Sequence, residues 1–193
     1  GYDVDIDTLH VLIKHSIFAF NRYVGINENT TSGGHKYNFH VYNNLLYGNV
    51  SRGILATEYT YKTDNINRYH NNISFDHDLW DMQIQDRAIH SYNSFDLPYY
   101  TPTSELYLNS PATINTEDFL SIPKDSEECT LILGATRKKD GSLPDLGRYF
   151  KLEDQSTLID AGVYVGLPYN GNAPDIGPFE SKVDPNGNLY PSL

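Results

Sequence analysis

A 28-residue repeat constrains the fold of this chain more than any other feature. Three segments align without a gap: "IKHSIFAFNRYVGI" (13–26), "VYNNLLYGNVSRGI" (41–54) and "YHNNISFDHDLWDM" (69–82). The spacing of 28 recurs, for example, at His15, Asn43 and Asn71. A fourth, shortened copy, "AIHSYNSFD", follows at 88–96. Self-similarity at a fixed period is typical of solenoids, in which each repeat buries its apolar face against its neighbours.

Each copy is predicted to form short strands. Apolar residues alternate within a copy, as at Val41, Leu45 and Tyr47, and a period of two indicates a β-strand. A second short strand is expected after the turn of each copy: 24–26, 53–55 and 82–84. The 3.6-residue periodicity of helical repeats does not appear. Short strands that stack at a constant spacing predict an all-β fold, the parallel β-helix, followed by an irregular C-terminal cap.

The polar residues inside these apolar runs have a predicted structural role. In stacked coils His15, Asn43 and Asn71 lie above one another, and we expect them to face inward beside the apolar rows. Stacked amides hydrogen-bond along the coil axis, so a buried amide no longer carries its desolvation cost. We interpret these residues as a ladder at a bend of the coil rather than as a ligand site.

The repeat ends near residue 97, after which several prolines break regular structure. We expect three parts: β-helix coils (1–97), a C-terminal region that packs on the end of the helix (98–180) and a tail (181–193). The segment "NTEDFLSI" is predicted to begin a short helix, with Asn115 or Thr116 as its N-cap.

Composition and charge narrow the classes of partner. A formal net charge of −11 argues against nucleic acid, because phosphate binding needs a basic face. An acidic polysaccharide is not excluded, since a bound cation can reverse the local field. The single cysteine, Cys129, cannot form an intrachain disulfide. No apolar run approaches the roughly 18 residues that suggest a membrane span. The chain opens on "GYDVDID" and is interpreted as a mature segment or the tail of something longer; we expect a monomer.

Several segments resemble a known family. "DGSLPDLGRYFKL…STLIDAGVYVGLPYNGNAPDIGPFE" (140–180) resembles the C-terminal signature of secreted right-handed parallel β-helix proteins from polysaccharide-degrading bacteria. "NSFDLP…INTEDFLSI" (93–122) is similar to the segment that leads off the helix in polysaccharide lyase family 9, the pectate-lyase-like group. The repeats "NNLLYGN" and "NNISFD" are similar to its coils. The resemblance implies a right-handed parallel β-helix, a secreted, periplasmic or cell-surface location, and an acidic, uronate-containing polysaccharide as partner.

The chemistry of that family, calcium-assisted β-elimination, implies particular site residues. Ca²⁺ held by aspartates neutralises the uronate carboxylate, and a basic side chain removes the adjacent proton. By resemblance, "GYD" (1–3) matches the end of the family's calcium run, which makes Asp3 the implied calcium ligand. In "GIN" (25–27), Asn27 occupies the position of the family's lysine base, and an amide cannot take a proton from carbon. Lys36 and Lys14 are the nearest lysines that could replace it.

Further candidates follow from the repeat itself. Lys14, Tyr42 and His70 are again 28 residues apart, which predicts one outward row of substrate-binding side chains for an acidic sugar. Arg52 is expected at a turn near the same face. An ordinary tyrosine-rich β-helix exterior would show the same pattern.

The segment "DHDLWD" is a second candidate metal site. Asp76, Asp78 and Asp81 could together bind a cation such as calcium, although an acidic turn needs no metal. The chain is thus predicted to be the C-terminal part of a lyase-like β-helix that acts on acidic polysaccharide. The alternative is a non-catalytic glycan-binding or structural β-helix that lacks the lysine base.

Overall fold

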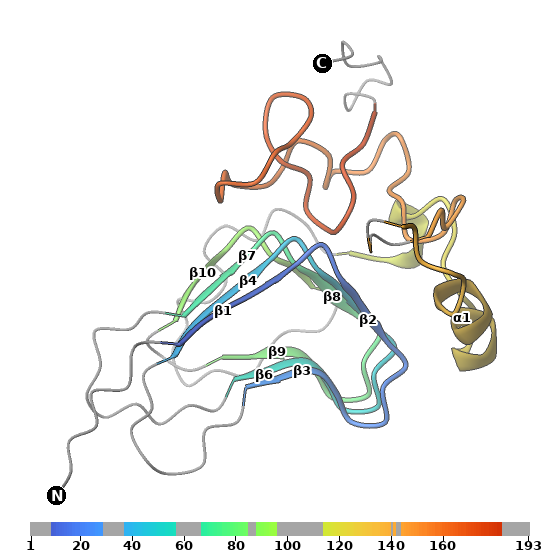
Figure 1. The fold of residues 1–193 in the computed structure, drawn as a ribbon, viewed down its shortest axis with the longest axis horizontal. Coiled ribbons are helices and arrows are strands. Elements are labelled where there is room, and N and C mark those ends of the chain that lie inside the picture. Colours follow the sequence, from blue (N-terminus) through green and yellow to red (C-terminus); the bar gives the residue numbers. More distant parts are fainter. Residues whose placement is uncertain are drawn as a thin grey trace, which may run out of the picture.

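The chain forms a triangular coil that repeats along one axis (Figure 1). The computed structural model describes residues 9–28, 37–56, 67–84, 88–95, 114–139, 141 and 144–182. A complete coil contributes three short strands, and stacking of the coils joins the strands into three parallel sheets. The predicted all-β fold with parallel β-helical coils is therefore confirmed.

The three sheets are named here by their strands. Sheet A contains β1 (Leu9–Lys14), β4 (Tyr37–Tyr42), β7 (Arg68–His70) and β10 (Ile89–Ser91). Sheet B contains β2 (Ile17–Ala19), β5 (Leu45–Tyr47), β8 (Ile73–Phe75) and β11 (Ser94–Phe95). Sheet C contains β3 (Val24–Glu28), β6 (Arg52–Ala56) and β9 (Trp80–Gln83).

Strand register follows the repeat. Ile13 pairs with Val41, and Val41 with Tyr69, so neighbouring coils are offset by the predicted 28 residues. The fourth copy is shortened, as expected, because Ile89 pairs with Arg68. The core inside the coils comes from side chains of all three sheets, among them Val41, Leu46, Ile54, Tyr69 and Met82.

The alternating pattern correctly located strands but underestimated their number. Each segment predicted as one strand is divided into a strand of sheet A and a strand of sheet B. The division falls at His15, Asn43 and Asn71, whose φ angles are 47°, 52° and 57°. This left-handed conformation is uncommon outside glycine, and Asn and His are among the residues that adopt it most often. The repeated polar residue therefore marks a corner of the coil.

The buried amide ladder lies one residue further along the chain than predicted. It consists of Asn44, Asn72 and Asn93, of which at most 2% is exposed. Asn72 Oδ1 accepts hydrogen bonds from the backbone N–H and from Nδ2 of Asn44, at 3.1 and 3.0 Å. Its Nδ2 donates to the carbonyl oxygen of Val41 at 2.8 Å and to Asn93 Oδ1 at 2.9 Å. Each amide thus satisfies the next along the axis.

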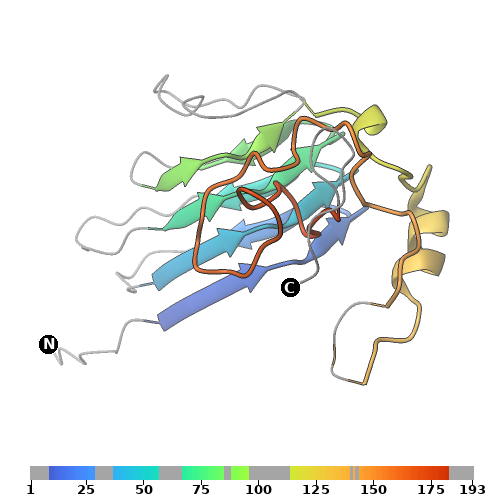
Figure 2. The same ribbon diagram turned by 90° about the horizontal axis from the view of Figure 1, so that it is seen from above.

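Asn43 and Asn71 stack as predicted, with 3.3 Å between Asn71 Nδ2 and Asn43 Oδ1. The expectation that they face inward is wrong, because their side chains bind residues 158–181, called here the C-terminal segment, outside the coil. Asn43 Nδ2 donates to the carbonyl of Asp175 at 3.1 Å, and Asn71 exchanges hydrogen bonds with the backbone of Val163 at 2.8 and 2.9 Å. The left-handed corner turns these side chains away from the coil interior. Seen from above, the C-terminal segment crosses the coils (Figure 2).

The two central strands of sheet B, β5 and β8, are buried on both faces. Leu45, Tyr47, Ile73 and Phe75 form a second core with residues of the C-terminal region. Those partners include Ile114, Phe119, Cys129, Phe150, Leu158 and Ile176. This burial explains why β5 and β8 have no exposed residue.

Two short helices lie in the described part of the C-terminal region. The 3-10 helix η2 (Thr116–Asp118) begins at Asn115, which forms a capping box with Asp118 and confirms Asn115 as the predicted cap. The helix α1 (Ser126–Leu133) was not predicted; its N-cap Asp125 accepts from Glu128 N–H at 2.8 Å. No helix within the described ranges has the length and apolar character needed to cross a membrane.

Two carboxyl groups are packed together where the C-terminal segment folds. Asp175, 1% exposed, accepts hydrogen bonds from the backbone N–H groups of Asp160 and Ser181, at 2.9 and 2.5 Å. Burial, followed by the charge of Asp175, raises the pKa of Glu180 to about 7. Burial also raises the pKa of Asp175. Folding therefore shifts the protonation equilibrium of both groups toward the neutral acid.

We expect the C-terminal segment to loosen as pH rises. A raised pKa contributes stability below the unfolded pKa of Glu, near 4.5, and that stability is lost as pH increases through about 7. Amide hydrogen exchange across residues 158–181, corrected for intrinsic rates, should show stronger protection at about pH 5 than at about pH 8. Glu180→Gln should reduce this difference. Equal protection at both pH values in the unaltered chain would contradict the assignment.

Candidate functional site

The strands of sheet A have an unusual charge for this protein. Among the residues of β1, β4, β7 and β10 there is no Asp or Glu, although the whole chain has a net charge of −11. The same strands contain one lysine, one arginine and four of the seven histidines of the chain: Lys14, Arg68, His10, His40, His70 and His90. A cationic surface in an acidic chain is a candidate site for an anionic ligand.

The register brings together the row predicted from the repeat. Lys14 pairs with Tyr42, and Tyr42 with His70. The rings of His40 and Tyr42 are stacked with centroids 5.4 Å apart, and those of Tyr42 and His70 lie 5.6 Å apart. Tyr42 and His70 are only 7% and 8% exposed, so little of either ring is open to solvent.

The basic side chains of these strands differ in exposure. Lys14 and His10 are exposed, whereas His40 and Arg68 are half-buried. Burial lowers the pKa of His40, and the positive charges of Arg68 and His10 lower it further. Burial is also the main cause that lowers the pKa of His70; the Ser91 carbonyl opposes it, and Arg68 and His40 add to it. The charged groups that act on these two imidazoles are therefore all cationic. We call the outer surface formed by His10, Lys14, His40, Tyr42, Arg68 and His70 the basic face.

Two predicted site residues lie elsewhere. Arg52 belongs to sheet C, where its guanidinium stacks over the Trp80 ring at 4.6 Å and donates to Ser51 Oγ at 2.8 Å. The expectation that Arg52 lies near Tyr42 and His70 is therefore wrong. Asn27 is exposed on sheet C, so Lys14 on sheet A does not occupy the place of the base implied at Asn27.

The acidic turn does not form a calcium site. Asp76 and Asp78 are exposed, whereas Asp81 is fully buried. Asp81 Oδ1 lies 3.9 Å from His77 Nε2. Across the part of the chain that the structure describes, no three or more His, Cys, Asp or Glu side chains are arranged to hold a metal ion. These residues thus do not fit calcium. Asp3 and Lys36 lie outside the described residues.

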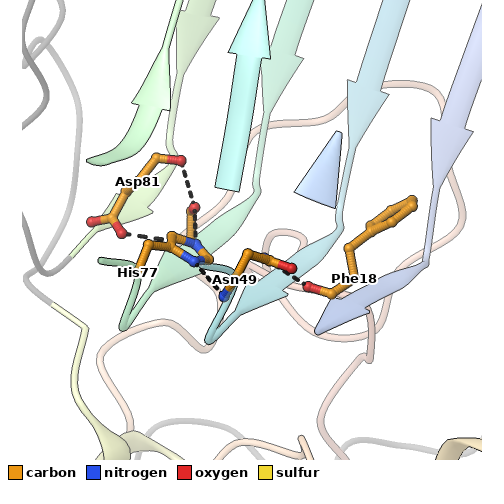
Figure 3. A network of polar contacts seen from close by, with 5 residues as sticks. Phe18, Asn49, His77 and Asp81 are labelled. Atoms are coloured by element: carbon orange, nitrogen blue, oxygen red, sulfur yellow. Dashed lines mark hydrogen bonds and ion pairs between the residues drawn. The ribbon is translucent and has the colours of Figure 1, made fainter. Parts of the chain in front are cut away.

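His77 instead completes a second ladder, at the turn between sheets B and C (Figure 3). Asn21, Asn49 and His77 are 28 residues apart, and this spacing was the available sequence signal. Asn49 donates its backbone N–H to His77 Nδ1 at 3.0 Å, and its Nδ2 donates to the Phe18 carbonyl at 3.1 Å. Because Nδ1 accepts, the neutral ring carries its proton on Nε2, which lies 3.0 Å from Ser74 Oγ.

The neighbouring Ser74, His77 and Asp81 do not have the arrangement of a hydrolase triad. All three are at most 4% exposed. Ser74 Oγ donates to the Asp81 backbone carbonyl at 2.7 Å, so its proton is not directed at the imidazole. Both Ser74 and Asp81 face the same imidazole nitrogen, whereas a triad uses one on each side. This cluster is structural.

Comparison with known proteins supports the fold. No protein-family model and no curated protein matches the chain. The structure is similar to the crystal structure of pectate lyase Pel9A, with a TM-score of 0.59 and 24% sequence identity over 88% of this chain. The match covers 35% of that structure, so the chain spans about a third of its length. Together with the three parallel sheets, this similarity shows that the chain has the right-handed parallel β-helix fold found in pectate lyase Pel9A.

Proposed function

We propose that this chain is part of a β-helix protein that binds an acidic, uronate-containing polysaccharide on the basic face. The observation that carries this proposal is the absence of carboxylates from the strands of sheet A, where Lys14 lies opposite Tyr42 and Arg68 lies opposite His40. A chain with net charge −11 repels a polyanion over most of its surface, and this face attracts it. Because such polysaccharides occur outside cells, we infer a secreted, periplasmic or cell-surface location.

The residues of the basic face have different roles in binding. Lys14 and Arg68 pair with the carboxylates of the glycan, and the planar guanidinium of Arg68 can engage one carboxylate through two hydrogen bonds. The rings of Tyr42 and His70, tilted by 30° with centroids 5.6 Å apart, pack against each other across neighbouring coils and support the register of β4 and β7. Cations on successive coils face the repeated charges of one polysaccharide chain.

Calorimetric titration with polygalacturonate tests this proposal. We expect Lys14→Gln and Arg68→Gln each to weaken binding by roughly 2- to 5-fold, the range typical of an exposed ion pair. Lys138→Gln is the matched control, because Lys138 is exposed and lies beyond α1 in the C-terminal region. A neutral glucan should not bind. The proposal fails if polygalacturonate does not bind, or if Lys138→Gln weakens binding as much as Lys14→Gln.

A second candidate function is β-elimination of the same polysaccharide, favoured by the fold similarity to pectate lyase Pel9A. Lys14 and Lys36 are the candidate bases, and Asp3 is the remaining candidate ligand for calcium. No catalytic step through calcium follows from the described residues, which do not fit it. Elimination would produce unsaturated uronate, whose ultraviolet absorbance can be followed with Ca²⁺ and then with chelator. Bound polygalacturonate without product would favour the non-catalytic alternative.

A further inference from the structure

We propose that acid strengthens polysaccharide binding at the basic face, because imidazoles of this face, among them His40 and His70, take up protons as the polyanion binds. This inference rests on the proposed function and adds a regulatory property to it. It also assigns a role to His10 and His40, which the repeat pattern did not single out. Histidine is the side chain whose charge changes in the relevant pH range.

The geometry places the three imidazoles within one continuous patch. His40 lies opposite Leu12 on β1 and opposite Arg68 on β7. His10 is two residues before Leu12 on the same strand, and side chains two residues apart share one face of a sheet. The Tyr42 ring stacks on that of His40 and contacts that of His70 in a tilted arrangement. Neighbouring coils are about 4.8 Å apart, so a bound carboxylate that meets one of these cations lies within reach of the next.

Charged groups on each element packed around this patch determine its response to pH. From the described strands they are Lys14 and His10 on β1, His40 and Tyr42 on β4, Arg68 and His70 on β7, and His90 on β10. The C-terminal segment contributes Asp160, Asp175 and Glu180, which bind one another's backbone at the corner between sheets A and B. The carboxylates are thus held in their own network, and the patch itself is cationic.

The environment of these imidazoles is the physical basis of the pH dependence. Without ligand, burial is the main cause that lowers the pKa of His40 and of His70, and the positive charges of Arg68 and of a neighbouring imidazole lower both pKa values further. Carboxylates of a bound polyanion would reverse the sign of the local field and favour the imidazolium forms. By linkage, binding then takes up protons, and affinity rises as pH falls. Carboxylates of the glycan stay ionised above about pH 4, like those of proteins.

Calorimetry at constant ionic strength tests the inference, since salt screens such contacts. We expect polygalacturonate to bind roughly tenfold more tightly at about pH 5.5 than at about pH 8, as two or three added surface ion pairs would produce. Titrations near pH 6 in two buffers of different ionisation enthalpy should give different heats, which measures proton uptake directly. The double variant His10→Gln/His40→Gln should lose most of both effects and leaves the buried His70 in place.

Lys14→Gln is the matched comparison, because it removes a cation whose charge does not change in this range. It should weaken binding by the same factor at both pH values. Binding without pH dependence and without proton uptake would overturn this inference and leave the proposed function intact. Full pH dependence in the double variant would also overturn it, since other groups would then be responsible. Absence of binding at both pH values would overturn the proposed function itself.

Discussion

Replacement of Asn72 by alanine is expected to lower the free energy of unfolding by about 3–5 kcal/mol. The side chain is fully buried and makes four hydrogen bonds, two through Oδ1 and two through Nδ2. Alanine would leave the carbonyl of Val41, the amide groups of Asn44 and Asn93 Oδ1 without these partners in the interior. Each buried polar group left unpaired costs about 1–3 kcal/mol, and relaxation recovers part of the sum. Such a loss is a large fraction of the free energy of unfolding of a typical domain, which is about 5–15 kcal/mol.

Urea unfolding followed by circular dichroism measures this effect. Asn27→Ala is the matched control, because Asn27 is an exposed asparagine in a strand of the same solenoid and should change stability by less than about 0.5 kcal/mol. Asn72→Asp should be no better than alanine, since it replaces a donor with a buried charge. A cost below about 1 kcal/mol for Asn72→Ala would show that the ladder does not stabilise the coils.

Gly53→Ala is expected to have a comparable effect for a different reason. A methyl group at Gly53 would overlap Ser74 Oγ and lie 2.5 Å from the Asp81 carbonyl oxygen and 2.7 Å from His77 Nε2. Ser74 and His77 are held by the second ladder, and the Asp81 oxygen belongs to the backbone, so none of them can move cheaply. Overpacking of a tight interior typically costs about 1–3 kcal/mol of stability. Because the Asp81 carbonyl is part of the backbone and cannot move aside easily, we expect Gly53→Ala to cost about 3 kcal/mol or more.

Two further variants separate the effect of steric overlap on stability from the effect of backbone conformation. Gly166 has φ of +83° with no atom within 4 Å of an added methyl group, so Gly166→Ala reports conformational strain alone, about 1 kcal/mol. Gly53→Ala combined with Ser74→Ala removes the overlapping hydroxyl but leaves the Asp81 carbonyl in place. Thermal unfolding should rank Gly53→Ala as the least stable of the single glycine variants. If Gly166→Ala were equally harmful, steric overlap would not be the cause.

The fold and the strand register could be predicted from the sequence wherever a residue pattern recurs in successive coils. The spacing of 28 correctly predicted the stacking of coils, the pairing of Lys14 with Tyr42 and Tyr42 with His70, and the shortened fourth copy. These predictions succeed because a solenoid contacts mainly its nearest neighbours, so one period determines the whole register. The cap was also predicted to within one residue, as Asn115 or Thr116, since a cap is a local interaction.

Features that depend on where the chain changes direction in space could not be predicted from the repeat. Alternation of apolar residues continues across the corner at Asn43, so the pattern did not reveal that one strand ends and another sheet begins there. The same missing corner placed Arg52 beside Tyr42, although the two residues belong to different sheets. Helix α1 was missed because its segment follows no repeat, although Asp125 and the acidic residues after it formed a recognisable N-terminal signal.

The C-terminal segment has a consequence for how the coils unfold. In a simple solenoid each coil gains stability only from its neighbours, so the ends can fray one coil at a time. Here the segment that contains Asp175 and Pro178 binds His15, Asn43 and Asn71, which come from three consecutive coils. Loss of one coil would also break its bonds to a segment that the other two still hold. The three coils are thereby coupled beyond nearest neighbours, and they should open as a single cooperative unit.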